Sequence, residues 1–359
     1  MNDILLIGKH YPAGVDFRAH NMGKMIMAST SKRDMAHAQE FGRRELLRNG
    51  IVAGASMVAW HAGLSPSLAQ TATIANKDVL SLQERAAALG IEVQAPNITK
   101  SLTGTGHLEL RTLADLVDSA LAKSSGAADD AEKLAADAGE LLSKLNRMVR
   151  PPRREGEAKG KAKPFAQLKG EYRKMFETCQ PDPKHLSELQ AWVTKLSSTS
   201  SRKRYGDLEA VTKVPWHVIA VIHYRECSAN FMGHLHNGDP IAKKTVNVPA
   251  ARPDPWNPPP SPWNPVTAWQ ASGIDAFTYD GLANQVDWGL ELTLYRLEAY
   301  NGFGTRNHGA IPNYLWNFSK FPVRGGYDSD GHWNPNYLSS QCGAAVLMKL
   351  LANQGLISV

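Results

Sequence analysis

The fold is decided by the stretch Val214–Pro240, which reads V-P-W-H-V-I-A-V-I-H-Y-R-E-C-S-A-N-F-M-G-H-L-H-N-G-D-P. A proline suits the first position of a helix, and the apolar run after it predicts a largely buried helix that ends near Glu226 or Cys227. At helical spacing, Glu226 shares a face with Ile219 and Ile222. The pattern therefore directs a carboxyl group toward an apolar interior.

This position suggests a chemical role for Glu226. Burial without a cationic partner disfavours the ionised form of a carboxyl group, and a general acid has to keep its proton near neutral pH. Glu226 is therefore our candidate general acid. The alternative is a glutamate at a helix end that faces solvent or pairs with Arg225.

Two segments carry a family resemblance. The apolar helix that delivers Glu226 and Cys227 resembles the catalytic helix of lysozyme-like peptidoglycan lyases and hydrolases, in which a Glu, often followed by Ser, ends a buried helix. Further along, Glu298–Gly304 (E-A-Y-N-G-F-G) looks like the A-Y-N-x-G motif of lytic transglycosylases and goose-type lysozymes. The region from about Phe165 to Val359 thus looks like a phage-endolysin or bacterial cell-wall lysin domain. Cys227 stands where the family usually has Ser, and no G-L-M-Q segment separates the two motifs.

The resemblance implies a mainly α (α+β) fold, namely a lysozyme-like helical domain with a small β-hairpin region, preceded by a helical N-terminal extension. It implies a glycosidase that cleaves peptidoglycan between N-acetylmuramic acid and N-acetylglucosamine, without a cofactor. By the same resemblance, Tyr300 hydrogen-bonds near the acid or the bridging oxygen, and Asn301 shapes the site. Asp239 becomes the second carboxylate, since goose-type enzymes place an Asp in the segment after their Glu.

The outcome of the cleavage stays open at this point. If Asp239 holds a water molecule on the opposite face of the sugar ring, the enzyme is an inverting hydrolase. If no carboxylate reaches that face, a hydroxyl of the substrate closes on the anomeric carbon and gives an anhydro-sugar, which is the lytic transglycosylase outcome.

A cluster of histidines offers an alternative enzyme class. His234 and His236 follow the H-x-H spacing, which puts both imidazoles on one face of the expected hairpin, and His223 lies on the preceding helix. Such histidines can start a zinc site, so a metal-dependent cell-wall hydrolase is the alternative function. We assign these three residues to substrate contacts and assign no metal ligand and no cofactor.

The segment Pro253–Pro265 is too rich in proline and tryptophan for a helix or a central strand. Trp256 and Trp263 are candidates for stacking on sugar rings, and a rigid clasp over the core is the alternative. A third function is therefore a noncatalytic peptidoglycan-binding protein, in which these rings hold the glycan and Glu226 is structural.

Composition divides the chain into four regions. Residues 1–69 form a leader, residues 70–149 a linker and a helical pair, and residues 150–164 a basic linker rich in Pro and Gly. Residues 165–359 form the expected catalytic domain, which we expect to fold on its own. The helical pair is indicated by apolar residues at helical spacing on both sides of Gly126.

Charge and hydropathy exclude some partners. The 359 residues carry a net charge of +6 and are 43% hydrophobic, which is sufficient for a core. No run of 18 apolar residues occurs, so we expect no transmembrane span. The net positive charge comes from the leader and the linker, and no folded region shows the basic, aromatic-rich face of a nucleic-acid-binding protein. We expect the glycan strands of peptidoglycan as the partner and leave the oligomeric state unassigned.

An export signal is indicated near the N-terminus. Arg43 and Arg44 precede a weakly apolar stretch, Ile51–Leu64, and a small-x-small sequence that ends at Ala69. This is the layout of a twin-arginine signal, and it predicts delivery of a folded protein to the periplasm or beyond. An amphipathic helix is the alternative, but several glycines disfavour it.

Replacing Arg43 and Arg44 together with lysine should hold the protein in the cytoplasm, because the export route reads the arginine pair. The measurement is fractionation of bacteria that express the full chain with a C-terminal tag. An Arg48→Lys variant changes a neighbouring arginine in the same way and should be exported normally. Unchanged export of the double variant would rule out the twin-arginine interpretation.

Overall fold

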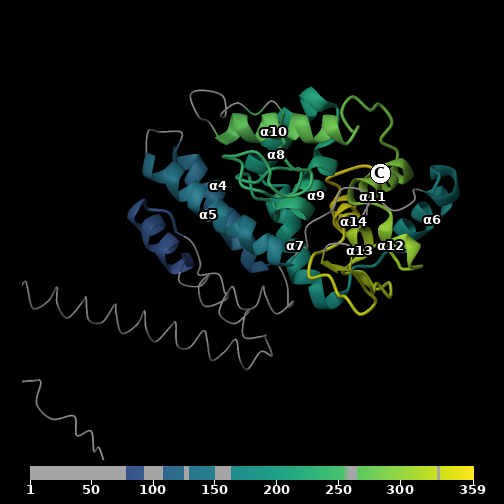
Figure 1. Cartoon of the computed structure of the whole chain (residues 1–359). Helices are drawn as coiled ribbons and strands as arrows, with labels where there is room; N and C mark the ends of the chain where they lie inside the picture. Colours follow the sequence, from purple (N-terminus) through teal and green to yellow (C-terminus); the bar gives the residue numbers. More distant parts are fainter. Residues whose placement is uncertain are drawn as a thin grey trace, which may run out of the picture. The chain divides into compact units, whose positions relative to one another are not determined.

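The computed structural model describes most of the chain after residue 77, in the ranges 78–92, 108–124, 129–149, 163–254, 256, 265–329 and 332–359. All of these residues belong to one compact unit, which is mainly helical (Figure 1). The predicted export signal, the basic linker at residues 150–162 and Trp263 lie outside the described ranges. No helix within those ranges has both the length and the apolar character that crossing a membrane requires.

Helix α9 (Trp216–Cys227) is the predicted central helix, and the structure confirms it. It follows Pro215, and all of its residues from Val218 onward are buried, because the apolar residues cover its whole circumference. Figure 1 shows it among other helices. Those that pack directly on it are α7 (Leu186–Leu196), α8 (Thr199–Thr212), α11 (Leu290–Asn301) and α14 (Ala344–Asn353).

An outer set of elements completes this helical core. Helix α6 packs on α11, α10 packs on α8, and α13 packs on both α11 and α14. The bounds are α6 (Phe165–Thr178), η1 (Pro183–His185), α10 (Pro265–Tyr279), α12 (Gly304–Asn307) and α13 (Asn313–Trp316).

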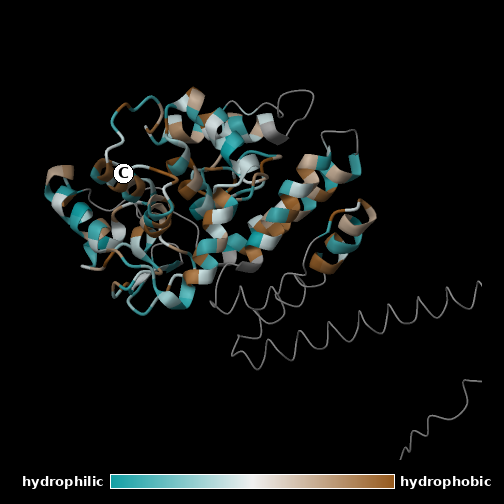
Figure 2. Cartoon of the chain, turned by 180° about the vertical axis from the view of Figure 1, so that it is seen from behind, coloured by the Kyte–Doolittle hydropathy of each residue, from teal (hydrophilic) through white to brown (hydrophobic). Residues whose placement is uncertain are grey.

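The predicted helical pair is also present, as α4 (Leu108–Ser124) and α5 (Asp129–Val149), beside a short helix at residues 78–88. Apolar and polar residues alternate around the turns of these helices in Figure 2, as expected for amphipathic helices. The pair packs closely together and buries leucines and alanines from both helices.

Contacts across the expected domain boundary tie this pair to the helical core. The buried Lys195 on α7 donates to Asp115 at 3.0 Å and to Asp118 at 2.7 Å, both on α4. Burial alone lowers the pKa of Lys195, but the two carboxylates outweigh it and raise the pKa above its usual value. On α5, Asn146 donates to the backbone carbonyl of Glu226 at 2.7 Å. The helical pair, before residue 150, is therefore in direct contact with the region expected to form a separate domain, after residue 164.

The two-stranded sheet in the described residues is not where the sequence predicts a hairpin. It consists of β1 (Gly326–Ser329) and β2 (His332–Asn334), paired antiparallel. The predicted hairpin region after Glu226 contains turns and one isolated bridge, Gly233 to Pro240. The backbone N–H groups of Val246 and Asn247 donate to the Asp239 carboxylate there, so they are not available to a partner strand.

The apolar spacing over Ile274–Tyr300 corresponds to two helices, α10 and α11, with a break between them. Gly281 and Asn284 have φ values of +67° and +61°, which a continuous helix cannot contain. The Asn284 N–H donates to the Thr212 carbonyl on α8 at 2.7 Å, so tertiary contact fixes the break. Val286, which fits the helical pattern, is 97% exposed.

The three cysteines, Cys179, Cys227 and Cys342, are buried free thiols. Burial raises the pKa of Cys179 to about 11 and also raises that of Cys342. Neither thiol is therefore set up to react as a thiolate.

A chain that begins at Pro164 should be less stable than the full chain, by several kcal/mol, because truncation removes the carboxylates that pair with Lys195 and the face of α4 that packs on α7. The sequence alone favours independent folding of residues 165–359, so these contacts give the opposite expectation. Thermal unfolding of both chains, followed by circular dichroism, is the measurement. Equal, cooperative transitions would assign the helical pair a dispensable role.

Candidate functional site

The carboxyl group of Glu226 is enclosed at the end of the central helix. Its side chain has 0% exposure. The hydroxyl of Tyr314, on α13, donates to Glu226 Oε1 at 3.1 Å. The expectation that Glu226 faces the interior is confirmed, and the solvent-facing alternative is wrong.

Residues from three distant parts of the chain fix the end of α9. Asn146 Nδ2 donates to the Glu226 carbonyl, and Asn146 Oδ1 accepts from Ser228 Oγ at 2.6 Å and from Gln341 Nε2 at 3.3 Å. Ser228 has φ +52°, so the helix stops there and the chain reverses. A Cβ on Gly238 would come within 2.5 Å of the Glu226 carbonyl oxygen. Glycine at 238 is thus required for the loop to approach the helix.

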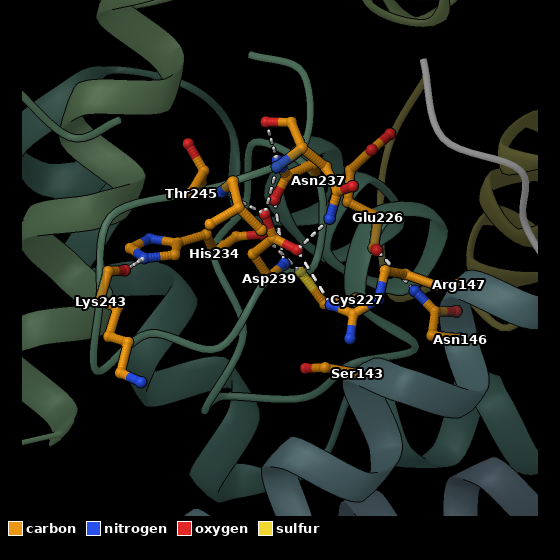
Figure 3. A network of polar contacts seen from close by, with 12 residues as sticks. Ser143, Asn146, Arg147, Glu226, Cys227, His234, Asn237, Asp239, Lys243 and Thr245 are labelled. Atoms are coloured by element: carbon orange, nitrogen blue, oxygen red, sulfur yellow. Dashed lines mark hydrogen bonds and ion pairs between the residues drawn. The ribbon is translucent and has the colours of Figure 1, made fainter. Parts of the chain in front are cut away.

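Asp239 lies in the same network, at its centre in Figure 3. Its Oδ1 accepts from Arg147 Nη1 at 2.9 Å and from Asn247 Nδ2 at 2.6 Å. Its Oδ2 accepts from the backbone N–H groups of Val246 and Asn247, both at 2.9 Å. Four donors occupy the acceptor capacity of a carboxylate, and the side chain is 1% exposed. Asp239 therefore holds the 239–247 loop in shape and ties it to α5.

His234 uses both ring nitrogens within the protein. Nε2 lies 2.7 Å from the Lys243 carbonyl, which can only accept, so Nε2 carries the hydrogen and Nδ1 accepts from Ser272 Oγ at 2.7 Å. Burial lowers the pKa of His234 to about 4. The ring is neutral, and neither nitrogen is available for a metal or a sugar without losing a hydrogen bond.

The other two candidate histidines point to different neighbours. His223 Nδ1 lies 3.0 Å from the Tyr205 hydroxyl, and burial lowers the pKa of His223 to about 3. His236 Nε2 lies 2.8 Å from Asp275 Oδ2, a carboxylate that also accepts two bonds from Arg252. The three side chains thus have three different hydrogen-bond partners, although the rings of His234 and His236 meet edge-on with their centroids 5.9 Å apart. In the described ranges, no three His, Cys, Asp or Glu side chains are grouped so that they could hold a metal ion.

The tyrosine of the A-Y-N-x-G segment contacts the loop that carries two of these histidines. The Tyr300 hydroxyl donates to the Leu235 carbonyl at 2.9 Å. Asn301 is half-buried as the last residue of α11. Tyr300 therefore supports the His234–His236 segment.

The glutamate of that motif has a structural role. Glu298 is buried and accepts from Arg306 Nη2 and from the Tyr172 hydroxyl, both at 2.8 Å. Burial raises the pKa of Glu298, although Arg306 opposes the shift. The network joins α6, α11 and α12.

Of the two candidate sugar-stacking tryptophans, the structure describes Trp256. Its ring meets His234 edge-on, with ring centroids 5.5 Å apart, and it is half-buried against the core. This arrangement matches the clasp alternative, since the ring packs on the loop.

Sequence reasoning missed Tyr314, Asn146 and Arg147 as parts of this site. Tyr314 belongs to a loop-rich region without a motif, and the other two lie on a helix with no cluster of chemically active residues. Each of the three contacts a residue more than 75 positions away in the sequence. No sequence pattern predicts a contact of that separation.

Comparison with known proteins found no family model, curated protein or solved structure that matches this chain.

Three histidines with lowered pKa values should make the protein less stable in mild acid. The pKa is lowered to about 4 for His217, about 3 for His223 and about 4 for His234, chiefly by burial. The unfolded chain binds these protons below about pH 6.5, so the free energy of unfolding falls as pH decreases through 6.5 toward 4. Each histidine contributes a slope of about 1.4 kcal/mol per pH unit in that window.

Urea unfolding at pH 7.5 and 5.5 measures this slope, in a range where most carboxyl groups stay ionised. A His223→Gln variant removes one such group and should lose less stability between the two values, whatever its absolute stability. Equal losses in the two proteins would contradict a neutral, buried His223.

Proposed function

We propose that this protein is a peptidoglycan-degrading glycosidase of the lysozyme-like kind, with Glu226 as its general acid. The observation that carries the proposal is a carboxyl group with 0% exposure, on a helix that is buried from Val218 onward, and hydrogen-bonded by the Tyr314 hydroxyl. A water-excluded carboxyl group is the type of acid that glycosidic cleavage needs. The sequence resemblance of the Glu226 and Tyr300 segments supports the substrate class.

In the proposed reaction, the Glu226 carboxyl donates its proton to the bridging oxygen as the bond to the anomeric carbon breaks. The carbon becomes oxocarbenium-like, and a nucleophile then has to reach its other face. A carboxylate that activates water there needs a free lone pair, and all four acceptor positions of Asp239 are occupied. This supports attack by a hydroxyl of the substrate itself, with its proton passing back to Glu226 and an anhydro-sugar as the product.

Access to the site requires a movement of the protein. Because Glu226 and Asp239 are 0% and 1% exposed, a glycan strand can reach the acid only when a neighbouring segment shifts. Export by the twin-arginine route fits the proposal, since peptidoglycan lies outside the cytoplasm.

The metal-dependent alternative has less support. His234 has both nitrogens hydrogen-bonded, and His223 and His236 contact Tyr205 and Asp275. Loss of activity on chelation would nonetheless favour it. Binding of peptidoglycan without release of fragments would favour the noncatalytic alternative.

Glu226→Gln should reduce the release of soluble muropeptides from purified peptidoglycan on the order of 10² to 10⁴-fold, because glutamine cannot donate a catalytic proton. Mass spectrometry of the products is the measurement. Products lighter by one water than hydrolytic ones are expected from the wild-type protein. Reducing-end products would instead indicate a muramidase.

Glu188→Gln is the matched control, since Glu188 is a second buried glutamate, on α7, and should tolerate the change with activity retained. Asp239→Asn should lower the melting temperature, through loss of the Arg147 ion pair, more than it changes the type of product. A folded Glu226→Gln protein with full activity would falsify the proposed function.

A further inference from the structure

The tyrosine that contacts the candidate acid is held rigidly. Tyr314 has 0% exposure, and its helix α13 follows Pro312. Arg225 lies on α9, the helix that carries Glu226, and its guanidinium group lies 4.5 Å from the centre of the Tyr314 ring. Arg225 is itself anchored, because its Nη1 donates to the Cys342 carbonyl at 2.9 Å.

The backbone around α13 also leaves no room for a shift. A Cβ on Gly343 would come within 2.2 Å of the Leu315 carbonyl oxygen, so the start of α14 lies directly against α13. The Gly343 N–H donates to the Asn317 carbonyl at 2.9 Å. The Tyr314 hydroxyl therefore meets Glu226 Oε1 in a fixed direction.

We propose that Tyr314 is the positioning residue of the general acid: by donating to Oε1 of Glu226, it assigns the transferable proton to Oε2. An oxygen that already accepts a hydrogen bond from a fixed hydroxyl acts as the carbonyl-like oxygen of the acid. The proton is then held on one defined oxygen, as directional transfer to a bridging oxygen requires. This inference rests on the proposed function, and it differs from the resemblance, which gives that part to Tyr300.

Tyr314 also affects the two protonation states unequally. A hydroxyl that donates to a carboxyl group stabilises the ionised form more than the neutral form. Removing the hydroxyl should thus keep the acid protonated to higher pH while making its proton less well oriented. A lower rate together with an alkaline limb displaced upward is a combination that a merely structural tyrosine would not produce.

Other ionisable groups lie around the end of α9, and the Tyr314→Phe change leaves all of them in the protein. They are Arg225, which bonds the Cys342 carbonyl, the Arg147–Asp239 pair, the neutral His223 and His234, and the Cys342 thiol. A phenylalanine at 314 keeps the ring beneath Arg225. A displaced profile therefore reports on the contact between Tyr314 and Glu226.

The experiment compares the pH dependence of kcat/KM for muropeptide release by the full-length wild-type protein and by Tyr314→Phe, Tyr300→Phe, Tyr224→Phe and Glu226→Gln. Tyr314→Phe should lower kcat/KM about tenfold and displace the alkaline limb of the profile upward. Tyr224 is the matched control: it is buried on α9, and its hydroxyl accepts from the Cys342 N–H at 2.9 Å. Its phenylalanine variant should lose stability and keep the wild-type profile.

A Tyr314→Phe profile that superimposes on the wild-type profile, while Glu226→Gln is inactive, would overturn the positioning role and leave the proposed function standing. A larger displacement in Tyr300→Phe would overturn it in favour of the resemblance. Full activity of Glu226→Gln would instead defeat the proposed function itself.

A second measurement does not depend on activity. Infrared titration of the carboxyl band that disappears in Glu226→Gln should show a higher midpoint pH in Tyr314→Phe than in the wild-type protein. An unchanged midpoint would overturn the contact as a determinant of the protonation of Glu226.

Discussion

The constraint on which the rest of the structure depends is the burial of the polar end of α9. A helix normally leaves its last carbonyl groups to water or to a cap, and here water is excluded. The Glu226 carbonyl is satisfied by Asn146, and the Arg225 carbonyl accepts from Gln341 at 3.2 Å. Leaving such groups without partners would cost about 1–3 kcal/mol each. The positions of α5 and of the segment before α14 follow from this requirement.

Buried charged side chains also need partners, as the buried backbone groups at the end of α9 do. Lys195 needs the carboxylates of α4, and Asp239 needs Arg147 of α5. A buried ion pair adds little net stability, but removing one partner is strongly destabilising. The helical pair α4–α5 therefore acts less as an appendage than as a set of polar partners for the core. Through Asn146 and Arg147, the pair also contacts the candidate site, although its sequence contains no cluster of catalytic residue types.

The site combines an enclosed acid with a loop that is closed by hydrogen bonds. Enclosure strengthens each electrostatic contact of Glu226, including that with Tyr314, because the surroundings are poorly polarisable. In the proposed enzyme, the same enclosure requires a movement of the protein before a glycan strand reaches Glu226. Asp239 stabilises the loop at the expense of a possible catalytic role. A carboxylate that accepts four hydrogen bonds is not available as a base. In the proposed enzyme, this division of labour favours cyclisation by the substrate over attack by water.

The sequence by itself determined the local elements and the candidate acid. Apolar spacing located α9 and the helical pair, and the position of Glu226 on an apolar face correctly placed it in the interior. These features depend on near neighbours along the chain, where periodicity is informative. The apolar spacing continues from α10 into α11, and it does not reveal the break between them, where the Asn284 N–H bonds to the Thr212 carbonyl.

Only the tertiary structure decided which residues meet Glu226 and what Asp239 does. The loop after α9 alternates like a strand, but two of its N–H groups bond to the Asp239 carboxylate. The two-stranded sheet in the described residues is formed by β1 and β2. Tyr314, Asn146 and Arg147 reach the site from positions 88, 80 and 92 residues away from their partners. The physical reason is that the sequence records the chemistry of each side chain and its local spacing, whereas hydrogen-bond partners across a core are chosen by the packing of whole helices.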